Sequence, residues 1–220
     1  MAVVIAVDGP AASGKGTLCR RIAHELQLAY LDTGSLYRAT ALRVMRRGPL
    51  KPGADGVVPG AAEEAMAITP EDLQDENLRS ELIGQAASIV AADHTVRGAL
   101  LDFQRLFCQS PPTGFRGVVM DGRDIGTVIC PCAPVKLYVT AKRLVRAFRR
   151  HKELVACGKD IGIDQVQNDM QQRDHRDSTR TLAPLCAAAD AFTIDTSNLD
   201  FDETVSAALA HIRDKLPAMF

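Results

Sequence analysis

The sequence of 220 residues contains no tryptophan, and aromatic residues make up only 5% of it. Its formal net charge is −1 at pH 7, so no large charge excess attracts nucleic acid or an anionic membrane surface. No apolar run is long enough to cross a membrane, and the first strand-like run is not preceded by the basic and apolar regions of a secretory signal. We therefore expect a soluble, untargeted protein of the cytoplasm, without nucleic acid or membrane partners. We also expect a monomer, although nothing in the sequence determines the oligomeric state.

The cysteines and histidines lack the spacing of a metal or redox motif. No CxxC pair occurs, and the five histidines do not fall at metal-ligand spacing. Cysteines without such motifs in a cytosolic protein are expected to be reduced thiols with a structural role. The six residues concerned are Cys19, Cys108, Cys130, Cys132, Cys157 and Cys186.

The length suits one α/β domain, 1–220, with room for a small inserted lobe. Apolar residues at helical spacing predict helices over 14–28 and 35–47. Five short β-branched or apolar runs predict buried parallel strands over 3–8, 29–32, 117–121, 135–140 and 191–195. Strands that alternate with helices imply right-handed crossovers, and hence a doubly wound five-stranded parallel sheet with helices on both faces.

Polar residues close every predicted strand. Four of the five end in Asp, and Thr140 ends the other. In an open parallel sheet the ligand crevice lies beyond the carboxyl ends of the strands, so the sequence predicts a functional site at that edge.

Two regions depart from the alternation of strands and helices. Residues 48–92 open with the Gly- and Pro-rich stretch GPLKPGADG and continue with acidic, helix-like segments that lack period-two alternation. We interpret them as a short, mainly helical insert within the domain. Residues 143–162 comprise an Arg-rich helix and the glycine-punctuated stretch VACGKDIG, which we interpret as a mobile loop.

Residues 9–17, GPAASGKGT, match the phosphate-loop pattern G-x-x-x-x-G-K between a predicted strand and a predicted helix. Glycines let backbone N–H groups surround an anion, the helix N-terminus favours negative charge, and the lysine bridges the terminal phosphates of a nucleoside triphosphate. The residues expected to bind the triphosphate here are Gly9, Pro10, Ala11, Ala12, Ser13, Gly14, Lys15, Gly16 and Thr17.

Gly16 stands where many such loops have a Ser or Thr whose hydroxyl ligates Mg²⁺. We therefore expect no direct protein ligand for Mg²⁺, which phosphate oxygens and water would hold near Ser13, Thr17 or a strand-end Asp. Asp121 either orients a water molecule on that ion or caps the following turn. The GKGT form is found in nucleoside monophosphate kinases.

Three further blocks identify the acceptor class. YLDTGSLYRA follows the second predicted strand, VVMDGRDIGTV ends the third, and QRDHRDSTRTLAPLCAAADA precedes the fifth. Together with the phosphate loop they resemble bacterial-type cytidylate kinases, in order and spacing, over nearly the whole chain. The resemblance implies a P-loop kinase that moves the γ-phosphoryl group of Mg²⁺-bound ATP to CMP or dCMP, within pyrimidine nucleotide metabolism.

The resemblance also implies that the insert 48–92 binds the nucleoside monophosphate and that 143–162 form a mobile lid. It further implies roles for individual residues. Arg38, Arg123 and Arg180 would grip the acceptor phosphate. The positions that would contact the base or ribose are Thr33, Ser88, Arg97, Asp124, Arg173 and Asp177. The lid residues that would close over ATP are Arg146, Arg149 and Arg150. The residues expected to act in catalysis are Lys15, Arg123, Arg149 and Arg180.

Elementary chemistry is consistent with these roles. A phosphomonoester loses its second proton at a pKa of about 6, so its attacking oxygen is already ionised at neutral pH and needs no general base. The task is to neutralise two anionic substrates and the charge on the transferring phosphoryl group, which fixed guanidinium groups do well.

Other interpretations remain open from the residues alone. The Arg and Asp residues of 173–180 also suit an exposed ion-pair network. The same scaffold serves kinases of other small acceptors, such as shikimate, gluconate, UMP or dTMP. A GTPase switch would need NKxD and DxxG, and neither occurs. The short insert leaves the preference between CMP and dCMP open.

Overall fold

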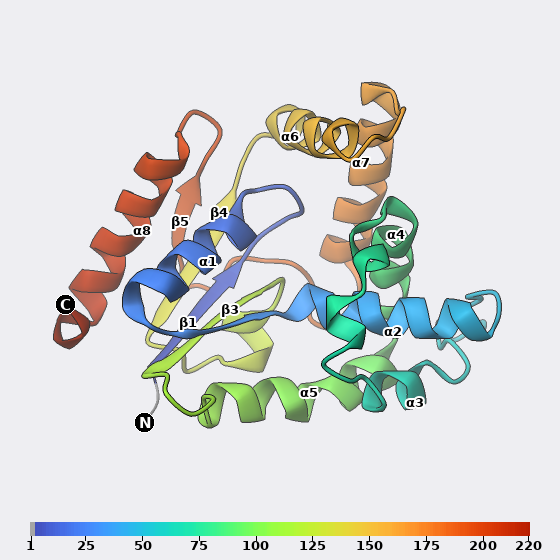
Figure 1. Ribbon diagram of the computed structural model, residues 1–220, viewed down its shortest axis with the longest axis horizontal. Coiled ribbons are helices and arrows are strands. Elements are labelled where there is room, and N and C mark those ends of the chain that lie inside the picture. Colours follow the sequence, from blue (N-terminus) through green and yellow to red (C-terminus); the bar gives the residue numbers. More distant parts are fainter. Residues whose placement is uncertain (1–2) are drawn as a thin grey trace.

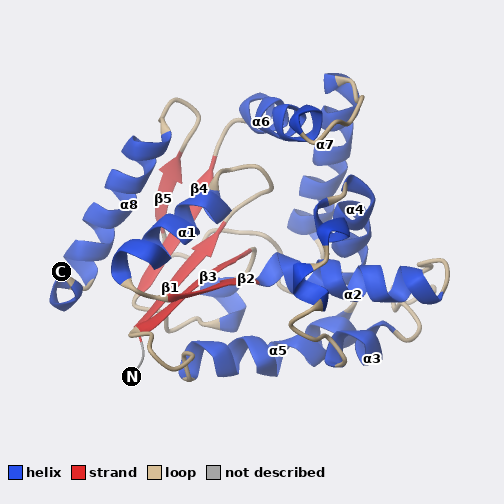
Figure 2. Cartoon of the chain, in the orientation of Figure 1, coloured by secondary structure: helices blue, strands red, loops and turns tan. Residues whose placement is uncertain are grey.

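The computed structural model describes residues 3–220 and contains one five-stranded sheet with helices around it (Figures 1 and 2). The strands are β1 (Val3–Asp8), β2 (Ala29–Asp32), β3 (Gly117–Gly122), β4 (Val135–Thr140) and β5 (Phe192–Asp195). All neighbouring strands are parallel, in the order β2-β3-β1-β4-β5. The predicted sheet is thereby confirmed, and the first and last residue of every strand lie within one residue of the predicted positions.

The helices are of several kinds. The α-helices are α1 (Lys15–Leu26), α2 (Thr33–Arg47), α3 (Ala61–Met66), α4 (Glu81–Val90), α5 (His94–Gln109), α6 (Arg143–Ala156), α7 (Ile163–Thr179) and α8 (Phe201–Lys215). Shorter turns are η1 (Asp72–Gln74), η2 (Glu76–Arg79) and η4 (Pro217–Met219), and η3 (Ile125–Ile129) is a π-helix. No helix among residues 3–220 is long and apolar enough to span a membrane.

The sheet is buried on both faces, as the near-continuous apolar strands require. In β1, Ile5 and Val7 pack in one core with α1 and α8, whereas Val4 and Ala6 pack in a second core with α5 and η3. This alternation follows from the period of two along a strand. Each fully buried aliphatic side chain contributes about 1.5–3 kcal/mol, so the two cores fix the carboxyl edge on which the site is built.

The region predicted as an insert is helical. It contains α3, α4 and two 3₁₀ turns, and no strand is described over 48–92. Its apolar residues pack against α2 and α5, where Leu36, Val58, Val90 and Val96 share one core. The helical content of this region is confirmed, whereas its limits as a separate lobe stay a prediction.

The region predicted as a lid consists of α6 and the turn that leads into α7. Ala147 and Leu154 of α6 pack on Val166 and Met170 of α7, and Ala11 and Ala12 of the phosphate loop contact the same small core. This cluster places the Arg-rich helix beside the loop (Figure 1). The mobility of the lid stays a prediction.

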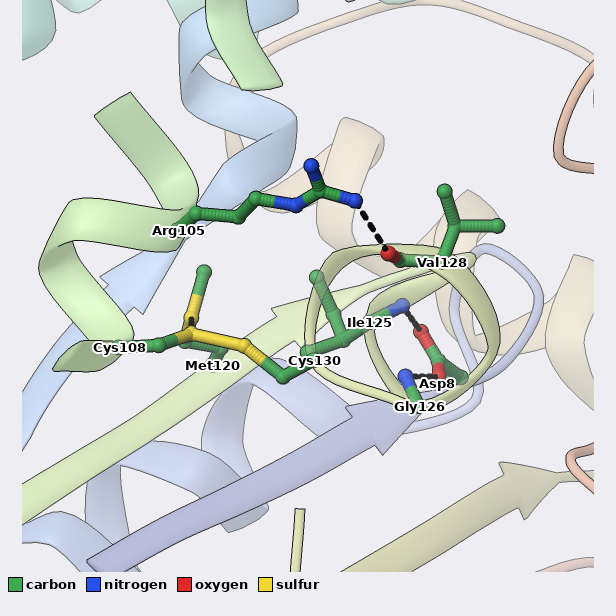
Figure 3. The surroundings of a disulfide bond; sticks show 8 residues. All are labelled: Asp8, Arg105, Cys108, Met120, Ile125, Gly126, Val128 and Cys130. Atoms are coloured by element: carbon green, nitrogen blue, oxygen red, sulfur yellow. Dashed lines mark hydrogen bonds between the residues drawn. A yellow bond between two sulfur atoms is a disulfide. The ribbon is translucent and has the colours of Figure 1, made fainter. Parts of the chain in front are cut away.

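One expectation about the cysteines is wrong. Cys108 at the end of α5 and Cys130 after η3 form a disulfide across a sequence separation of 22 (Figure 3). Both elements cover the same face of the sheet, and this packing brings the two sulfur atoms together. No local motif announces such a pair, because the contact is made only when α5 and η3 dock. The free thiols are Cys19, Cys132, Cys157 and Cys186.

Candidate active site

The phosphate loop runs from the end of β1 to the start of α1. Gly9 lies against β4, where an added Cβ would be 2.0 Å from the carbonyl oxygen of Val139. Gly14 caps α1 with φ at 90°, in the left-handed region that favours glycine. Close packing against β4 therefore requires glycine at position 9, and the backbone conformation favours glycine at position 14. Together the two glycines shape the predicted cradle.

Two buried polar side chains face this cradle. Ser13 is 0% exposed, and its hydroxyl has no hydrogen-bond partner among residues 3–220. Lys15 Nζ donates to the carbonyl oxygen of Pro10 over 3.4 Å and lies 3.5 Å from Asp121 Oδ1. Burial, and then the nearby Arg123 guanidinium, lower the pKa of Lys15. A buried hydroxyl without a partner is rare in folded proteins, so the cradle fits a ligand that supplies hydrogen-bonding oxygens.

The first turn of α1 differs from the loop in what surrounds it. Thr17 is exposed, so Ser13 is the buried hydroxyl of the loop. Beside Gly16 stands the carboxylate of Asp121, which accepts a hydrogen bond of 3.3 Å from the Tyr30 hydroxyl. Burial, followed by the charge of Asp121, raises the pKa of Tyr30 well above its usual range, so the phenol remains a donor.

A cavity of about 50 Å³ lies beside the end of β3. Four segments line it: the start of α2, the end of α4, the end of β3 and the end of α7. The lining residues are Thr33, Gly34, Tyr37, Ala87, Ser88, Ala91, Gly122, Arg123, Asp124, Arg173, Asp177 and Arg180. The structure thus brings together most of the side chains that the sequence assigns to the acceptor, from positions up to 147 residues apart.

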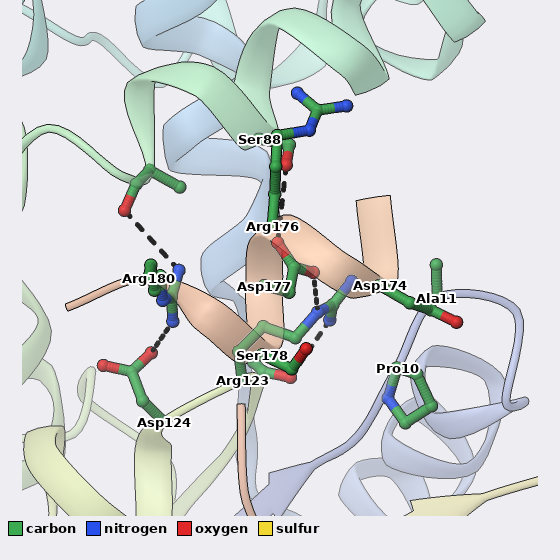
Figure 4. A network of polar contacts seen from close by, with 12 residues as sticks. Pro10, Ala11, Ser88, Arg123, Asp124, Asp174, Arg176, Asp177, Ser178 and Arg180 are labelled. Atoms are coloured by element: carbon green, nitrogen blue, oxygen red, sulfur yellow. Dashed lines mark hydrogen bonds and ion pairs between the residues drawn. The ribbon is translucent and has the colours of Figure 1, made fainter. Parts of the chain in front are cut away.

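One half of this cavity is organised around Asp177, which is 5% exposed (Figure 4). Arg123 Nε donates to Asp177 Oδ2 over 2.9 Å, and Ser88 Oγ donates to its Oδ1 over 3.4 Å. Although burial opposes ionisation, the guanidinium groups of Arg123 and Arg173 keep the pKa of Asp177 below its usual range. The carboxylate is therefore charged, and it holds Arg123 at the cavity wall.

The other half is organised around Asp124. Arg97 forms a close ion pair with it, and Arg180 lies 3.5 Å from its Oδ1. Arg97 and Arg180 also donate to the carbonyl oxygen of Ala91, over 3.4 Å and 3.5 Å. This network connects α4, α5, η3 and α7 around one carboxylate, so the candidate base-contacting residues are interdependent.

Arg173 is the least satisfied of the arginines at this cavity. Its Nε is buried and has no partner among residues 3–220. Burial, reinforced by Arg123, lowers its pKa to about 9. An anion in the cavity would supply both the missing acceptor and the compensating charge. The surplus of guanidinium groups therefore fits a phosphate group.

Arg38 is placed differently from the other predicted phosphate-binding residues. Its Nη1 donates to the carbonyl oxygens of Leu78 and Ser80, over 2.6 Å and 3.4 Å, and it does not line the cavity. An added Cβ at Gly84 would lie 3.3 Å from its Nη2, so α4 packs closely on the guanidinium. In this structure Arg38 joins α2 to the insert.

The three arginines of the predicted lid have separate partners. Arg146 donates to Ala11 O over 3.2 Å and pairs with Asp174, which joins the loop to α7. Arg149 donates to Thr196 Oγ1 over 2.8 Å. Arg150 pairs with two acidic residues: its partners are Glu81 of α4 and Glu153 of α6.

Sequence reasoning missed three residues that shape the site. Thr196, 3% exposed, donates to Ser13 O over 3.1 Å and so connects β5 to the loop. Asp8 accepts bonds of 2.8 Å from the N–H groups of Ile125 and Gly126 (Figure 3), and burial raises its pKa to about 6. Tyr30 is the third. Asp8 ends a predicted strand and Thr196 follows one, so their place at the sheet edge was an available signal.

The arrangement is suited to group transfer between two anions. The end of β3 contributes Asp121 to the phosphate loop and Arg123 to the cavity, so the two candidate phosphate sites share one strand end. Among residues 3–220, no group of three or more acidic, histidine or cysteine side chains could hold a metal ion. A phosphate loop on a parallel sheet beside an arginine-lined cavity defines the class of P-loop kinases.

Solved structures share the fold. A sugar kinase from Janibacter sp. HTCC2649 matches with a TM-score of 0.52 and 14% identity, over 100% of this chain and 98% of that one. A shikimate kinase from Bacteroides thetaiotaomicron matches with a TM-score of 0.50 and 10% identity, over 99% of each chain. Identities this low show the architecture alone.

Sequence relatives give the family. The model of the cytidylate kinase family matches residues 5–214. The cytidylate kinase of Rhodospirillum rubrum is 51% identical, over 94% of this chain and 95% of the relative. The cytidylate kinase of Paramagnetospirillum magneticum is 50% identical, over 98% of this chain and 100% of the relative. The chain belongs to the cytidylate kinase family, and the resemblance seen in the sequence is confirmed.

Proposed function

We propose that this protein transfers the γ-phosphoryl group of ATP to CMP or dCMP and releases ADP with CDP or dCDP. The observation that carries the proposal is the shared end of β3, where Asp121 contacts Lys15 of the phosphate loop and Arg123 lines the cavity beside it. One phosphate group bound by the loop and another bound in the cavity would therefore lie close together. Membership of the cytidylate kinase family supports a cytidine nucleotide as the acceptor and ATP as the donor.

The residues then take distinct tasks. Lys15 and the loop amides hold the triphosphate, and Arg123, Arg173 and Arg180 neutralise the acceptor phosphate and the charge that develops during transfer. The acceptor oxygen attacks the γ-phosphorus without losing a proton, since it is already ionised at neutral pH. Arg149, which we place at the ATP side through Thr196, supplies a further positive charge.

The donor set fits a magnesium ion held through phosphate oxygens and water. Ser13 Oγ is buried without a partner, and the Asp121 carboxylate faces the first turn of α1. When bound, Mg²⁺ neutralises charge on the triphosphate and orients it for transfer. Ser13 and Asp121 would act on its water shell, consistent with a loop that has glycine after its lysine.

Nucleotide binding requires the cavity to widen. Sites for drug-sized ligands usually measure about 300–1,000 Å³, whereas the cavity here measures about 50 Å³. Residues 48–92 form one wall through Ser88, and 143–162 contact that wall through Arg150 and Glu81. We propose that these two segments move apart to admit CMP and close afterwards, which excludes water and limits ATP hydrolysis. We propose that the protein acts as a monomer in the cytoplasm.

The decisive experiment measures ADP formation from Mg²⁺-ATP with CMP, dCMP, UMP, dTMP, AMP and shikimate in parallel. We expect turnover with CMP and dCMP to exceed the rate without acceptor by at least about a hundredfold, because only these acceptors would satisfy Asp124, Arg97 and Ser88. ATP consumption that CMP does not accelerate would refute the proposal. Equal rates with UMP would refute the base-reading role of Asp124.

A further inference from the structure

The glycine after the loop lysine has a steric cause. Gly16 lies within α1 and is not among the residues with positive φ, so its backbone conformation suits any residue. An added Cβ would lie 3.1 Å from Asp121 Oδ2 and 3.7 Å from the Tyr30 hydroxyl. Glycine is favoured here because the Asp121 carboxylate lies closer than an ordinary contact to the Cβ position and would have to shift to admit a Ser or Thr side chain, while the Tyr30 hydroxyl lies at contact distance behind it.

The two side chains reach this point from neighbouring strands. Tyr30 belongs to β2 and Asp121 to β3, and their register pairs Asp32 with Asp121. Tyr30 is two residues from Asp32 and therefore points to the same face of the sheet, the face covered by α1. The strand register thus aims the phenol at the carboxylate beside Gly16.

Both oxygens of Asp121 are engaged. Oδ2 accepts the bond of 3.3 Å from Tyr30, and Oδ1 lies 3.5 Å from Lys15 Nζ. The Tyr30 ring packs against the core between the sheet and α1, and the Arg20 guanidinium lies 5.9 Å from its centroid. Tyr30 is held by contacts along its ring, so its hydroxyl fixes the orientation of the carboxylate.

We propose that Tyr30 is a positioning residue that holds Asp121 over Gly16, so that the carboxylate takes the place of the hydroxyl that follows the lysine in many phosphate loops. The inference rests on the proposed use of Mg²⁺-ATP. It assigns Tyr30 a role towards the metal-bound triphosphate and none towards the acceptor.

The test compares Tyr30→Phe with Tyr138→Phe. Tyr138 also lies near the phosphate loop, in a cavity with Pro10 and Arg146, but its hydroxyl makes no hydrogen bond within residues 3–220, so its loss controls for the removal of a phenol oxygen that does not touch Asp121. Loss of a hydrogen bond to a carboxylate is expected to lower kcat about tenfold and to raise the Mg²⁺ concentration for half-maximal activity, with KM for CMP unchanged. Tyr138→Phe should match the wild type in all three quantities.

A binding measurement separates this proposal from the proposed function. Titration calorimetry with a non-hydrolysable ATP analogue, with and without Mg²⁺, gives the factor by which the metal strengthens binding. That factor should fall about tenfold in Tyr30→Phe and stay at the wild-type value in Tyr138→Phe. An unchanged factor would overturn the role of Tyr30, whereas a wild type that binds the analogue but ignores CMP would overturn the function instead.

A rescue experiment tests the replacement directly. Asp121→Ala removes the carboxylate and opens the space over Gly16, so Gly16→Ser should restore a hydroxyl there. We expect the double variant to be at least about tenfold more active than Asp121→Ala, and Gly16→Ser alone to be impaired by the clash with Asp121. A double variant no better than Asp121→Ala would show that the two groups do not share one place.

Discussion

The phosphate loop and the acceptor cavity are built in different ways. One continuous segment, 9–17, forms the loop, whereas the cavity takes side chains from four segments between Thr33 and Arg180. Backbone geometry and one close approach shape the loop, whereas ion pairs from Arg123 to Asp177 and from Arg97 to Asp124 shape the cavity. Substitutions in the loop should therefore act largely through backbone strain and lower the stability of the fold. Substitutions in the cavity should act through lost charge complementarity with the acceptor.

The largest effect is expected where the two regions meet. Arg123→Ala should lower kcat/KM for CMP at least about a hundredfold, equivalent to about 3 kcal/mol of transition-state stabilisation, because the guanidinium is expected to contact the transferring phosphoryl group. Arg180→Ala should behave alike. Steady-state kinetics with circular dichroism as a folding check measure both, with exposed Arg116→Ala as the control. Activity within tenfold of the wild type would contradict their roles.

Strain in the loop should be visible in stability. Gly9→Ala places a Cβ 2.0 Å from the carbonyl oxygen of Val139, so β1 and β4 must shift apart. We expect the free energy of unfolding to fall by about 3 kcal/mol. Gly162→Ala is the matched control, because nothing lies within 4 Å of its Cβ position. Denaturant unfolding measures both, and equal stability of the two variants would show that the loop is not held by this contact.

The pH dependence of the free energy of unfolding should reveal the buried carboxyl group of Asp8, at the end of β1. The pKa of Asp8 is about 6 in the folded chain, against 3.8 for an ordinary Asp. Its contribution to the free energy of unfolding is therefore fully present below pH 3.8 and is lost as the pH rises through about 6. Two pKa units correspond to about 3 kcal/mol. Unfolding free energies of Asp8→Asn should decline less between pH 4 and 7 than those of the wild type. Exposed Asp102→Asn should keep the wild-type slope.

The smallest effect concerns recognition of the acceptor rather than transfer. Asp177→Ala should raise KM for CMP about tenfold and change kcat less, because Asp177 is expected to contact the ribose and orients Arg123. The ratio of CMP to dCMP turnover should also fall. Exposed Asp164→Ala, on the same helix, should leave KM unchanged. If KM did not rise, Asp177 would have to be removed from the proposed ribose site.

The sequence predicted far more of the architecture than of the side-chain contacts. Strands such as Val135–Thr140 lie where apolar runs indicated, and the region 48–92 is helical as expected. The grouping of Ser88 and Arg97 with Asp124 also agrees with the family resemblance, and their roles remain predictions. The disulfide between Cys108 and Cys130 was not foreseen, because neither cysteine lies in a motif.

In the predicted lid, the sequence did not predict which partners the arginine side chains contact. Its three arginines recur at helical spacing, which places them near one face of α6 but does not select their partners. In the folded chain Arg146 reaches the loop, Arg149 reaches Thr196 and Arg150 reaches α4. Long flexible side chains adopt the partner that docking brings near, so their contacts follow from the packing of α6 rather than from spacing.

The sequence by itself determined the strands, the crossovers and the phosphate loop, because periodicity and the conformational freedom of Gly14 act over a few residues. Only the tertiary structure decided why Gly16 follows the lysine, since the reason lies in Tyr30 and Asp121 on two other strands. It also decided which guanidinium faces which carboxylate. Such contacts depend on how distant segments dock, and no local pattern encodes that geometry.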